Sequence, residues 1–324
     1  MAQYDMLVIG TGPAGQKAAV QAAKLGKKVG IIERKEVVGG VCTNTGTIPS
    51  KSLREAVLYL SGFRQRTLYG AEYRLKKTIT IEDLAFRANH VIKNEIEIVQ
   101  NQMARNRIDL IFGEARFVDP HRLLIQHAGT STEHHAHVIV IAVGTEPARP
   151  AEIPFDDDTI IDTDGFLTLK HLPTSMVIVG GGVIGTEYAS ILATMGVPVI
   201  LIDKRPRLLE FVDAQIIGAL QQQITDIGVT LCHEEEVVAI RKESDGQITV
   251  SLMHRPPITT TTLMYAIGRI GATKHLNLEA IGITPDERGR VIVNDHFQTA
   301  VPHIYAAGDV IGFPALASTS MQQG

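Results

Sequence analysis

Apolar and polar positions along the chain follow one arrangement twice. An apolar strand, a glycine-rich turn, a helical stretch and a second apolar strand succeed one another over residues 7–33, and again over residues 177–203. The expected elements are strands at 7–9 and 28–32 around a helix at 16–25, and strands at 177–179 and 197–202 around a helix at 186–195. Because this order makes a βαβ unit of a parallel sheet, the pattern predicts an α/β fold with two Rossmann-like halves.

Each turn has the glycine spacing G-x-G-x-x-G, and each second strand ends in an acid. The glycines are Gly10, Gly12 and Gly15 in the first copy and Gly180, Gly182 and Gly185 in the second, with Glu33 and Asp203 as the acids. The first glycine permits a tight turn, the second lets a pyrophosphate approach the backbone, and the third packs helix against strand. The acid accepts a hydrogen bond from a ribose hydroxyl. One such turn alone could be structural, but two complete copies favour two dinucleotides bound by one chain.

The remaining hydrophobic pattern sets the expected domain boundaries. It predicts helices at 49–60 and 83–105, an antiparallel meander at 110–140, a buried strand at 138–145, and later strands ending at 266–269 and within 304–310. A proline-rich stretch followed by three acids marks a domain crossing: Pro147, Pro150, Pro154, Asp156, Asp157 and Asp158. We therefore expect a first domain at 1–150, a second at 151–270 and a return segment at 271–324, with a small antiparallel β-meander in each domain.

Composition and charge exclude several classes of partner. The chain has 324 residues, 44% hydrophobic content and a net charge of −4, which argues against nucleic acid and membrane surfaces as partners. Its two cysteines cannot make a disulfide framework and indicate a reducing compartment. The N-terminus enters the first strand without a basic leader, and no apolar run approaches the roughly 20 residues of a membrane span. We expect a cytoplasmic protein.

The most informative segment is Gly-Gly-Val-Cys-Thr-Asn-Thr-Gly-Thr-Ile-Pro-Ser-Lys, residues 39–51. It resembles the redox-active helix of the two-dinucleotide-binding flavoprotein disulfide reductases, the class I pyridine nucleotide-disulfide oxidoreductases. That family has two cysteines five residues apart, where this chain has Cys42 and Thr47. A hydroxyl cannot close a disulfide. Cys42 is then either a reactive thiol or a packing residue kept beside the flavin.

The resemblance covers the whole chain and implies a set of binding residues. FAD would be held by Gly10, Gly12, Gly15, Glu33, Arg34, Lys35, Glu36, Val37, Val38, Gly39, Gly40, Val41, Cys42, Ala115, Gly144, Thr145, Asp309 and Ala317. NAD or NADP would be held by Gly180, Gly182, Gly185, Asp203, Lys204 and Gly268. As catalytic residues, Lys51 would lie near flavin N5 and pair with Glu187, where a fixed cation favours anionic reduced flavin.

The same resemblance names the domains and the assembly. It implies that 1–150 is the first part of the FAD-binding domain, 151–270 the NAD(P)-binding domain and 271–324 the return of the FAD-binding domain. A C-terminal α+β dimerisation domain of roughly 100 residues or more would be missing beyond Gly324. For a full-length chain we expect a homodimer or a higher oligomer.

Within that family the segment looks most like the soluble pyridine nucleotide transhydrogenases. That likeness implies an Si-specific NAD(P)+ transhydrogenase with NADPH and NAD+ as substrates, working by a ping-pong path through FAD without a redox disulfide. Asp203 suits a ribose 2′-hydroxyl, and Lys204, Arg205 or Arg207 could compensate a 2′-phosphate. Two alternatives are a dihydrolipoamide-dehydrogenase-like or other NAD(P)H flavin reductase, and a nucleotide-binding fragment without turnover.

Three further groups of residues receive structural interpretations. His134, His135 and His137 could suggest a metal, but a solvated turn is favoured because no acids accompany them in a clear pattern. The run Glu234 to Glu236 is expected to be a solvated edge. Cys232 follows a glycine in an apolar strand and is expected in the core.

Overall fold

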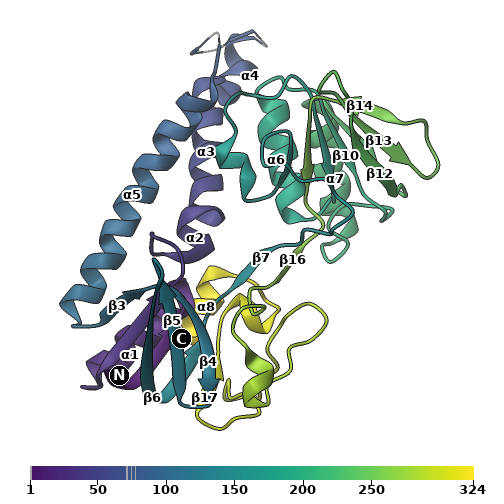
Figure 1. Cartoon of the computed structure of the whole chain (residues 1–324). Coiled ribbons are helices and arrows are strands. Elements are labelled where there is room, and N and C mark those ends of the chain that lie inside the picture. The colour runs from purple at the N-terminus through teal and green to yellow at the C-terminus, as the bar shows by residue number, and fades with distance from the viewer. Residues whose placement is uncertain (1, 71, 74, 77) are drawn as a thin grey trace. The chain divides into compact units, whose positions relative to one another are not determined.

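The computed structural model describes residues 2–70, 72–73, 75–76 and 78–324. The chain divides into two compact units. Figure 1 shows the chain coloured by residue number from the N-terminus to the C-terminus. Unit 1 contains Met1–Pro49, His90–Glu146 and Arg269–Gly324; unit 2 contains Ser50–Asn89 and Pro147–Gly268. In the part of the chain that the structure describes, no helix is long and apolar enough to cross a membrane.

Unit 1 is built on a parallel sheet with apolar side chains on both faces. Its parallel strands are β1 (Ala2–Ile9), β2 (Val29–Glu33), β3 (Asp109–Phe112), β6 (Thr130–Ile141) and β17 (Ile304–Ala306), in the order β3-β2-β1-β6 with β17 beside β6. Val8 and Ile31 face the alanines of α1 (Pro13–Lys24), whereas Leu7 and Ile32 face the opposite core. Burial of both faces explains the continuous apolar runs of β1 and β2.

An antiparallel meander branches from the long strand β6. It consists of β4 (Glu114–Asp119), β5 (Arg122–His127) and the first half of β6, which pairs with β5 before its second half pairs with β17. The prediction of a meander in the first domain is confirmed, but two of its details were wrong. Residues 109–112 form β3, which pairs in parallel with β2, and residues 130–141 form one strand instead of two.

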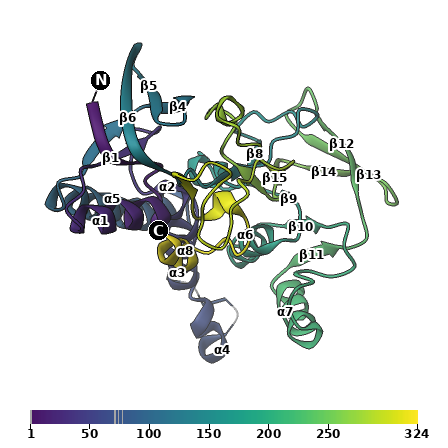
Figure 2. The same cartoon turned by 90° about the horizontal axis from the view of Figure 1, so that it is seen from below.

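Helical segments connect and cover the strands. They are α2 (Gly40–Asn44), α3 (Thr47–Leu60), η1 (Phe63–Gln65), α4 (Arg66–Tyr69), α5 (Ile81–Arg105), η3 (Leu278–Ile281), η4 (Asp309–Ile311) and α8 (Ala317–Gln323). In unit 1, α8 packs against α1, as Figure 2 shows near the C-terminus. The helices α3 and α5 each run from one unit into the other.

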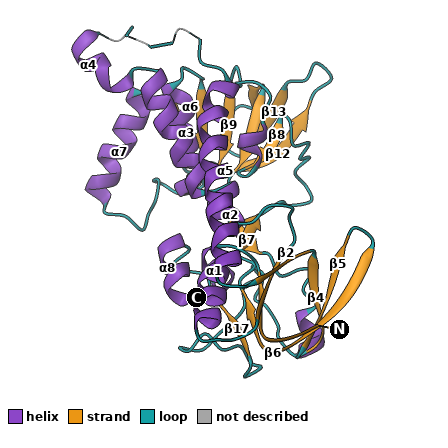
Figure 3. Ribbon diagram, turned by 90° about the vertical axis from the view of Figure 1, so that its left-hand side faces the viewer, coloured by secondary structure: helices purple, strands orange, loops and turns teal. Residues whose placement is uncertain are grey.

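Unit 2 repeats the parallel sheet with a separate antiparallel sheet on one face. Its parallel order is β11 (Val229–Cys232), β10 (Val199–Ile202), β9 (Met176–Val179), β15 (Thr262–Tyr265) and β8 (Ile160–Asp162). One face of this sheet is covered by two helices, α6 (Val183–Thr194) and α7 (Ala214–Asp226). The other face packs against the predicted second meander, which consists of β12 (Val237–Lys242), β13 (Ile248–Leu252) and β14 (Ile258–Thr260) (Figure 3). Cys232 lies in the core, as predicted.

The segment Ser50–Asn89 packs differently from its expected place in 1–150. Leu53 and Val57 of α3, with Leu84 of α5, are buried in the core formed by α6, α7 and the sheet of unit 2. Their helical spacing was visible in the sequence, but the partner of an apolar helix face is decided by tertiary packing. The other unit boundaries, at Glu146 and Gly268, lie close to the expected 150 and 270.

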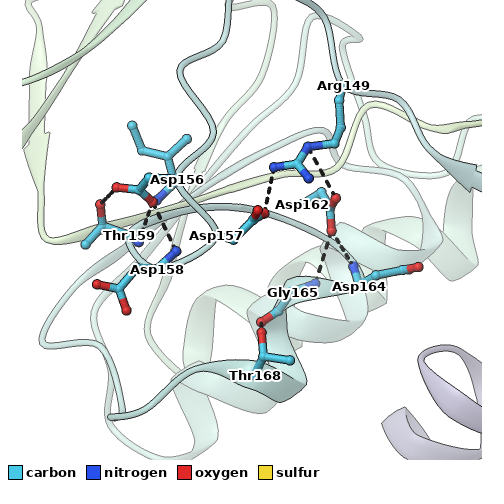
Figure 4. Close-up of polar contacts among 10 residues, drawn as sticks. Arg149, Asp156, Asp157, Asp158, Thr159, Asp162, Asp164, Gly165 and Thr168 are labelled. Carbon is cyan, nitrogen blue, oxygen red and sulfur yellow. Dashed lines mark hydrogen bonds and ion pairs between the residues drawn. The ribbon is translucent and has the colours of Figure 1, made fainter. Parts of the chain in front are cut away.

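The segment that leads from unit 1 into unit 2 contains a strand, β7 (Thr145–Pro147), and an acidic loop. The strands β7 and β16 (Arg269–Gly271) form a two-stranded sheet. In the loop that follows, Asp156 accepts hydrogen bonds from the backbone of residues 158, 159 and 160, and Arg149 bonds to Asp157 at 2.6 Å (Figure 4). Asp162 accepts the backbone N–H groups of Asp164 and Gly165, at the start of η2 (Gly165–Thr168). These carboxylates therefore organise backbone.

The interpretation of the histidine cluster was wrong, and that of the run Glu234 to Glu236 was wrong for Glu235 alone, since Glu234 and Glu236 are exposed. His134, His135 and His137 lie in strand β6, where His135 stacks on His121. Among the described residues, no group of three His, Cys, Asp or Glu could hold a metal ion. Glu235 is 2% exposed, and one of its oxygens accepts the backbone N–H groups of Glu236, Met253 and His254. Burial acts to raise the pKa of Glu235, but these three donors outweigh it and hold that pKa below its usual range.

Candidate functional site

The first glycine turn has three different environments at its three glycines. Gly10 has φ +108°, and a Cβ there would lie 2.3 Å from the carbonyl oxygen of Ala142. A Cβ at Gly15 would lie 1.9 Å from the oxygen of Gly10, whereas one at Gly12 would meet nothing within 4 Å. Gly10 therefore makes the turn, Gly15 permits close packing, and Gly12 opens a space before the N-terminus of α1.

The second turn reproduces these environments in unit 2. Gly180 has φ +112°, and a Cβ there would lie 2.6 Å from the oxygen of Ala266. A Cβ at Gly185 would lie 2.0 Å from the oxygen of Gly180, and one at Gly182 would again meet nothing within 4 Å. Both helices thus present unobstructed backbone N–H groups, which suit the phosphates of a dinucleotide.

Glu33 is tied to the first glycine turn through Thr11. The Glu33 carboxylate, which is 7% exposed, accepts hydrogen bonds from the hydroxyl of Thr11 and from its backbone N–H at 3.3 Å. The Thr11 hydroxyl oxygen in turn accepts the N–H of Gly39 at 3.0 Å. Thr11 was not among the residues expected from the sequence, because a residue between two glycines carries no pattern of its own. It joins the end of β2, the glycine turn and the start of α2.

The stretch after Glu33 returns to the same turn. Arg34, Lys35, Glu36 and Val37 are exposed, whereas Val38 is fully buried, and Gly39 has φ +106° at the N-cap of α2. A Cβ at Gly40 would lie 2.8 Å from Cα of Gly12. Gly39 and Gly40 therefore lie against the first glycine turn, and Val41 follows them in α2.

Cys42 and Thr47 contact each other across the break between α2 and α3. Their side chains are hydrogen-bonded, and both cysteines of the chain are free. Burial raises the pKa of the Cys42 thiol, and the negative charge of Asp309 adds to that effect, while Thr47 opposes it. A thiol with a raised pKa is a poor nucleophile at neutral pH. The raised pKa and the hydrogen bond to Thr47 together favour a packing role for Cys42 over a reactive one.

Asp309 reaches this site from the last part of the chain. Burial raises its pKa, and it accepts a hydrogen bond from the Ser320 hydroxyl at 3.2 Å while Arg269 lies near enough to lower that pKa. Arg269 donates two hydrogen bonds at 3.0 Å to Thr145, which follows Gly144. Ser320 and Arg269 had not been singled out from the sequence. The other two expected contacts lie in different places: Ala115 is buried in β4, and Ala317 begins α8.

In unit 2 the expected nucleotide residues follow the carboxyl ends of three adjacent strands, β10, β9 and β15. Asp203 is 6% exposed and bonds to the backbone of Gly181 and to both the backbone and the side chain of Arg205. Lys204 is exposed. Gly268, with φ +97°, follows β15, which neighbours β9 in the sheet.

Lys51 and Glu187 form an ion pair within unit 2. The ammonium of Lys51 on α3 lies 2.6 Å from a carboxylate oxygen of Glu187 on α6. The Lys51 side chain is 58% exposed. The Glu187 side chain is 19% exposed, but an ion pair with one partner this open to solvent is screened and contributes little to stability. Stability alone therefore gives no strong reason for placing these two residues together.

Known proteins share both the sequence and the architecture. Residues 4–324 match the family described as pyridine nucleotide-disulphide oxidoreductase. The chain belongs to this family. It is 52% identical over 326 aligned residues to a soluble pyridine nucleotide transhydrogenase of Mycobacterium bovis, covering 100% of this chain and 69% of the relative. A transhydrogenase of Colwellia psychrerythraea is 42% identical, covering 99% and 69%. These values confirm the resemblance to the oxidoreductase family and to its transhydrogenases.

Two solved structures have the same fold. The HOCl-induced flavoprotein disulfide reductase RclA of Escherichia coli, in a Cu(II) complex, has a TM-score of 0.88 and 29% identity, with 100% of this chain and 69% of that chain covered. LpdA of Mycobacterium tuberculosis has a TM-score of 0.89 at 23% identity, covering 100% and 71%, which supports the fold alone. The α/β class with two Rossmann-like parts is confirmed.

Proposed function

We propose that this chain binds FAD at the first glycine turn and NAD or NADP at the second, as an Si-specific soluble NAD(P)+ transhydrogenase. The observation that carries the proposal is Thr47, which stands beside Cys42 where a disulfide reductase needs its second thiol. The transhydrogenases at 52% and 42% identity support it. FAD, when bound, supplies a hydride acceptor and donor for a ping-pong reaction between NADPH and NAD+.

The chain's own residues position and insulate that chemistry. The open spaces before α1 and α6 fit two pyrophosphates, and Glu33 and Asp203 fit the two adenosine riboses. Asp309, buried and bonded to Ser320, fits a ribityl hydroxyl. Because Thr47 cannot accept electrons as a disulfide partner, the proposed site offers them no protein acceptor. We therefore propose a second nicotinamide as the acceptor.

A direct assay tests the proposal. The FAD-loaded protein is mixed with NADPH and thionicotinamide NAD+, and formation of the reduced thio analogue is followed by its absorbance. We expect transfer to the thio analogue and no turnover with lipoamide. Turnover with lipoamide or quinones instead would favour a dihydrolipoamide-dehydrogenase-like or other flavin reductase. If the flavin-loaded protein transfers no hydride to any acceptor, the transhydrogenase proposal is wrong. The chain would then be a nucleotide-binding fragment without turnover.

Lys51 is proposed to supply a positive charge during hydride transfer. Replacement by methionine keeps most of the side-chain volume and removes the charge. We expect Lys51→Met to lower kcat for NADPH to thio-NAD+ transfer about 100- to 1000-fold, with a small change in KM, since charge stabilisation acts on the transition state. Initial steady-state rates at varied NADPH and thio-NAD+ concentrations measure both constants.

Arg54 provides a matched control on the same helix. It is exposed and pairs with Glu55 at 2.9 Å, so Arg54→Met removes a comparable surface ion pair. We expect its kcat to stay close to that of the wild type. An unchanged kcat in Lys51→Met, or an equal loss in Arg54→Met, would contradict the role of Lys51. In the proposal, the NAD(P)+ transhydrogenase is cytoplasmic and, as a full-length chain, a homodimer or a higher oligomer.

A further inference from the structure

The carboxylate of Asp203 is fully engaged by Arg205 and the glycine turn. One oxygen accepts the backbone N–H and Nε of Arg205, both at 2.8 Å. The other accepts Nη2 of Arg205 at 2.6 Å and the backbone N–H of Gly181. The guanidinium therefore binds both oxygens in the side-on, bidentate geometry that makes such pairs strong.

The pair is ionised on both sides. Burial acts to raise the pKa of Asp203, but the hydrogen bonds from Arg205 and from the backbone outweigh it and lower that pKa below its usual range. The hydrogen bond to Asp203 raises the pKa of Arg205. The two charges cancel, so the pair presents no net charge at the end of β10.

The backbone that carries the pair is fixed from the neighbouring strand. The backbone N–H of Asp203 donates to the backbone oxygen of Cys232 at 2.9 Å. The backbone oxygen of Asp203 accepts the N–H of Glu235, and that of Arg205 accepts the N–H of Glu234. Glu235 is itself anchored to the segment between β13 and β14 through Met253. A ligand can therefore change the arrangement of the two side chains more easily than that of the backbone.

The neighbouring basic residues do not share this geometry. Arg207 donates to the backbone oxygen of Glu210 at 3.2 Å, and Lys204 is exposed. Among the described contacts, Arg205 is therefore the basic candidate that binds the Asp203 carboxylate.

We propose that Asp203 and Arg205 act as one coupled specificity element, which accepts either nucleotide by opening the same ion pair. A 2′-hydroxyl must donate to an Asp203 oxygen that Arg205 now occupies. A 2′-phosphate must draw the guanidinium away from Asp203, leaving that carboxylate close to the phosphate. Each nucleotide thus loses part of its binding energy to the pair, and neither is excluded. The inference rests on the proposed nucleotide site at the second glycine turn.

Binding of two small probes tests the coupling independently of catalysis. The dissociation constants of 2′,5′-ADP and 5′-ADP are measured by calorimetry on the FAD-loaded protein. We expect Arg205→Gln to weaken 2′,5′-ADP about 10- to 100-fold, the range for losing a charge-assisted contact, and to strengthen 5′-ADP because Asp203 is released. Asp203→Asn should do the opposite, strengthening 2′,5′-ADP. The double variant should show non-additive changes, since both substitutions remove the same interaction.

Comparison variants separate coupling from simple contact. Arg205→Lys keeps the charge without the bidentate fork, so it should bind 2′,5′-ADP better than Arg205→Gln does, while Arg207→Gln should leave the ratio of the two constants unchanged. If Arg205→Gln weakens 2′,5′-ADP but leaves 5′-ADP unchanged, Arg205 is a plain phosphate ligand and the coupling is wrong. Equal changes of both dissociation constants in Arg205→Gln would also overturn the coupling. A change in their ratio in Arg207→Gln alone would overturn it too. A wild-type protein that binds neither probe would overturn the proposed nucleotide site as well.

Discussion

Thr47→Cys is expected to convert the site into one that stores an additional electron pair. The side chains at 42 and 47 are already in hydrogen-bond contact, so a thiol at 47 would face the Cys42 sulfur. On oxidation the two sulfurs form a disulfide with loss of two protons and two electrons, and NADPH can return those electrons. Anaerobic titration should therefore consume twice as many NADPH equivalents per flavin as in the wild type.

Thiol counting gives an independent readout of the same variant. The wild type has two free cysteines, whereas oxidised Thr47→Cys should keep only Cys232 free until NADPH is added. Thr47→Ser controls for loss of the threonine methyl group, and Cys42→Ser combined with Thr47→Cys controls for a thiol without a partner. Both controls should titrate like the wild type. If Thr47→Cys keeps all its thiols free after oxidation, the two positions do not have the geometry of a redox pair.

The glycine turns show what a local pattern can establish. Gly10 and Gly180 could be recognised because a tight turn after a strand needs a positive φ, and both have one. The acids at the strand ends were equally recognisable from their spacing. These features depend on a few consecutive residues, so the sequence is sufficient to predict them. Thr11 shows the limit, since its link between Glu33 and Gly39 exists only after the strands assemble.

Residues whose environment comes from distant segments could not be interpreted in the same way. Glu235 stands in a run of three acids, which is typical of a solvated surface, yet it is buried because the backbone at Met253 and His254 supplies its donors. The apolar face of α3 was visible, but its packing in unit 2 depends on helices more than a hundred residues away. Arg205 was one of three basic candidates until the contacts with Asp203 separated it from Lys204 and Arg207.

Replacing the second glycine of each turn by aspartate is expected to abolish binding of a different cofactor in each case. Gly12 and Gly182 are helix N-caps with ordinary extended backbone, φ −67° and −74°, and a Cβ added at either would meet nothing within 4 Å. Aspartate is a favoured N-cap, so neither helix should be lost. Its charge would occupy the place proposed for a pyrophosphate. A like charge about 4 Å away at an effective dielectric constant near 20 costs about 4 kcal/mol, or roughly a thousandfold in affinity.

The two variants should therefore fail in different ways. Gly12→Asp should purify without the yellow flavin absorbance, while Gly182→Asp should keep its flavin and lose binding of 2′,5′-ADP. Asparagine at the same positions has nearly the same shape without the charge, so Gly12→Asn and Gly182→Asn should retain much more of each ligand. Circular dichroism confirms that all four variants are folded. If Gly12→Asp retains its flavin, FAD is not bound at the first turn. If, in addition, Gly182→Asp loses its flavin, FAD is bound at the second turn instead. Equal losses with asparagine would mean that volume, and not charge, excludes the ligand.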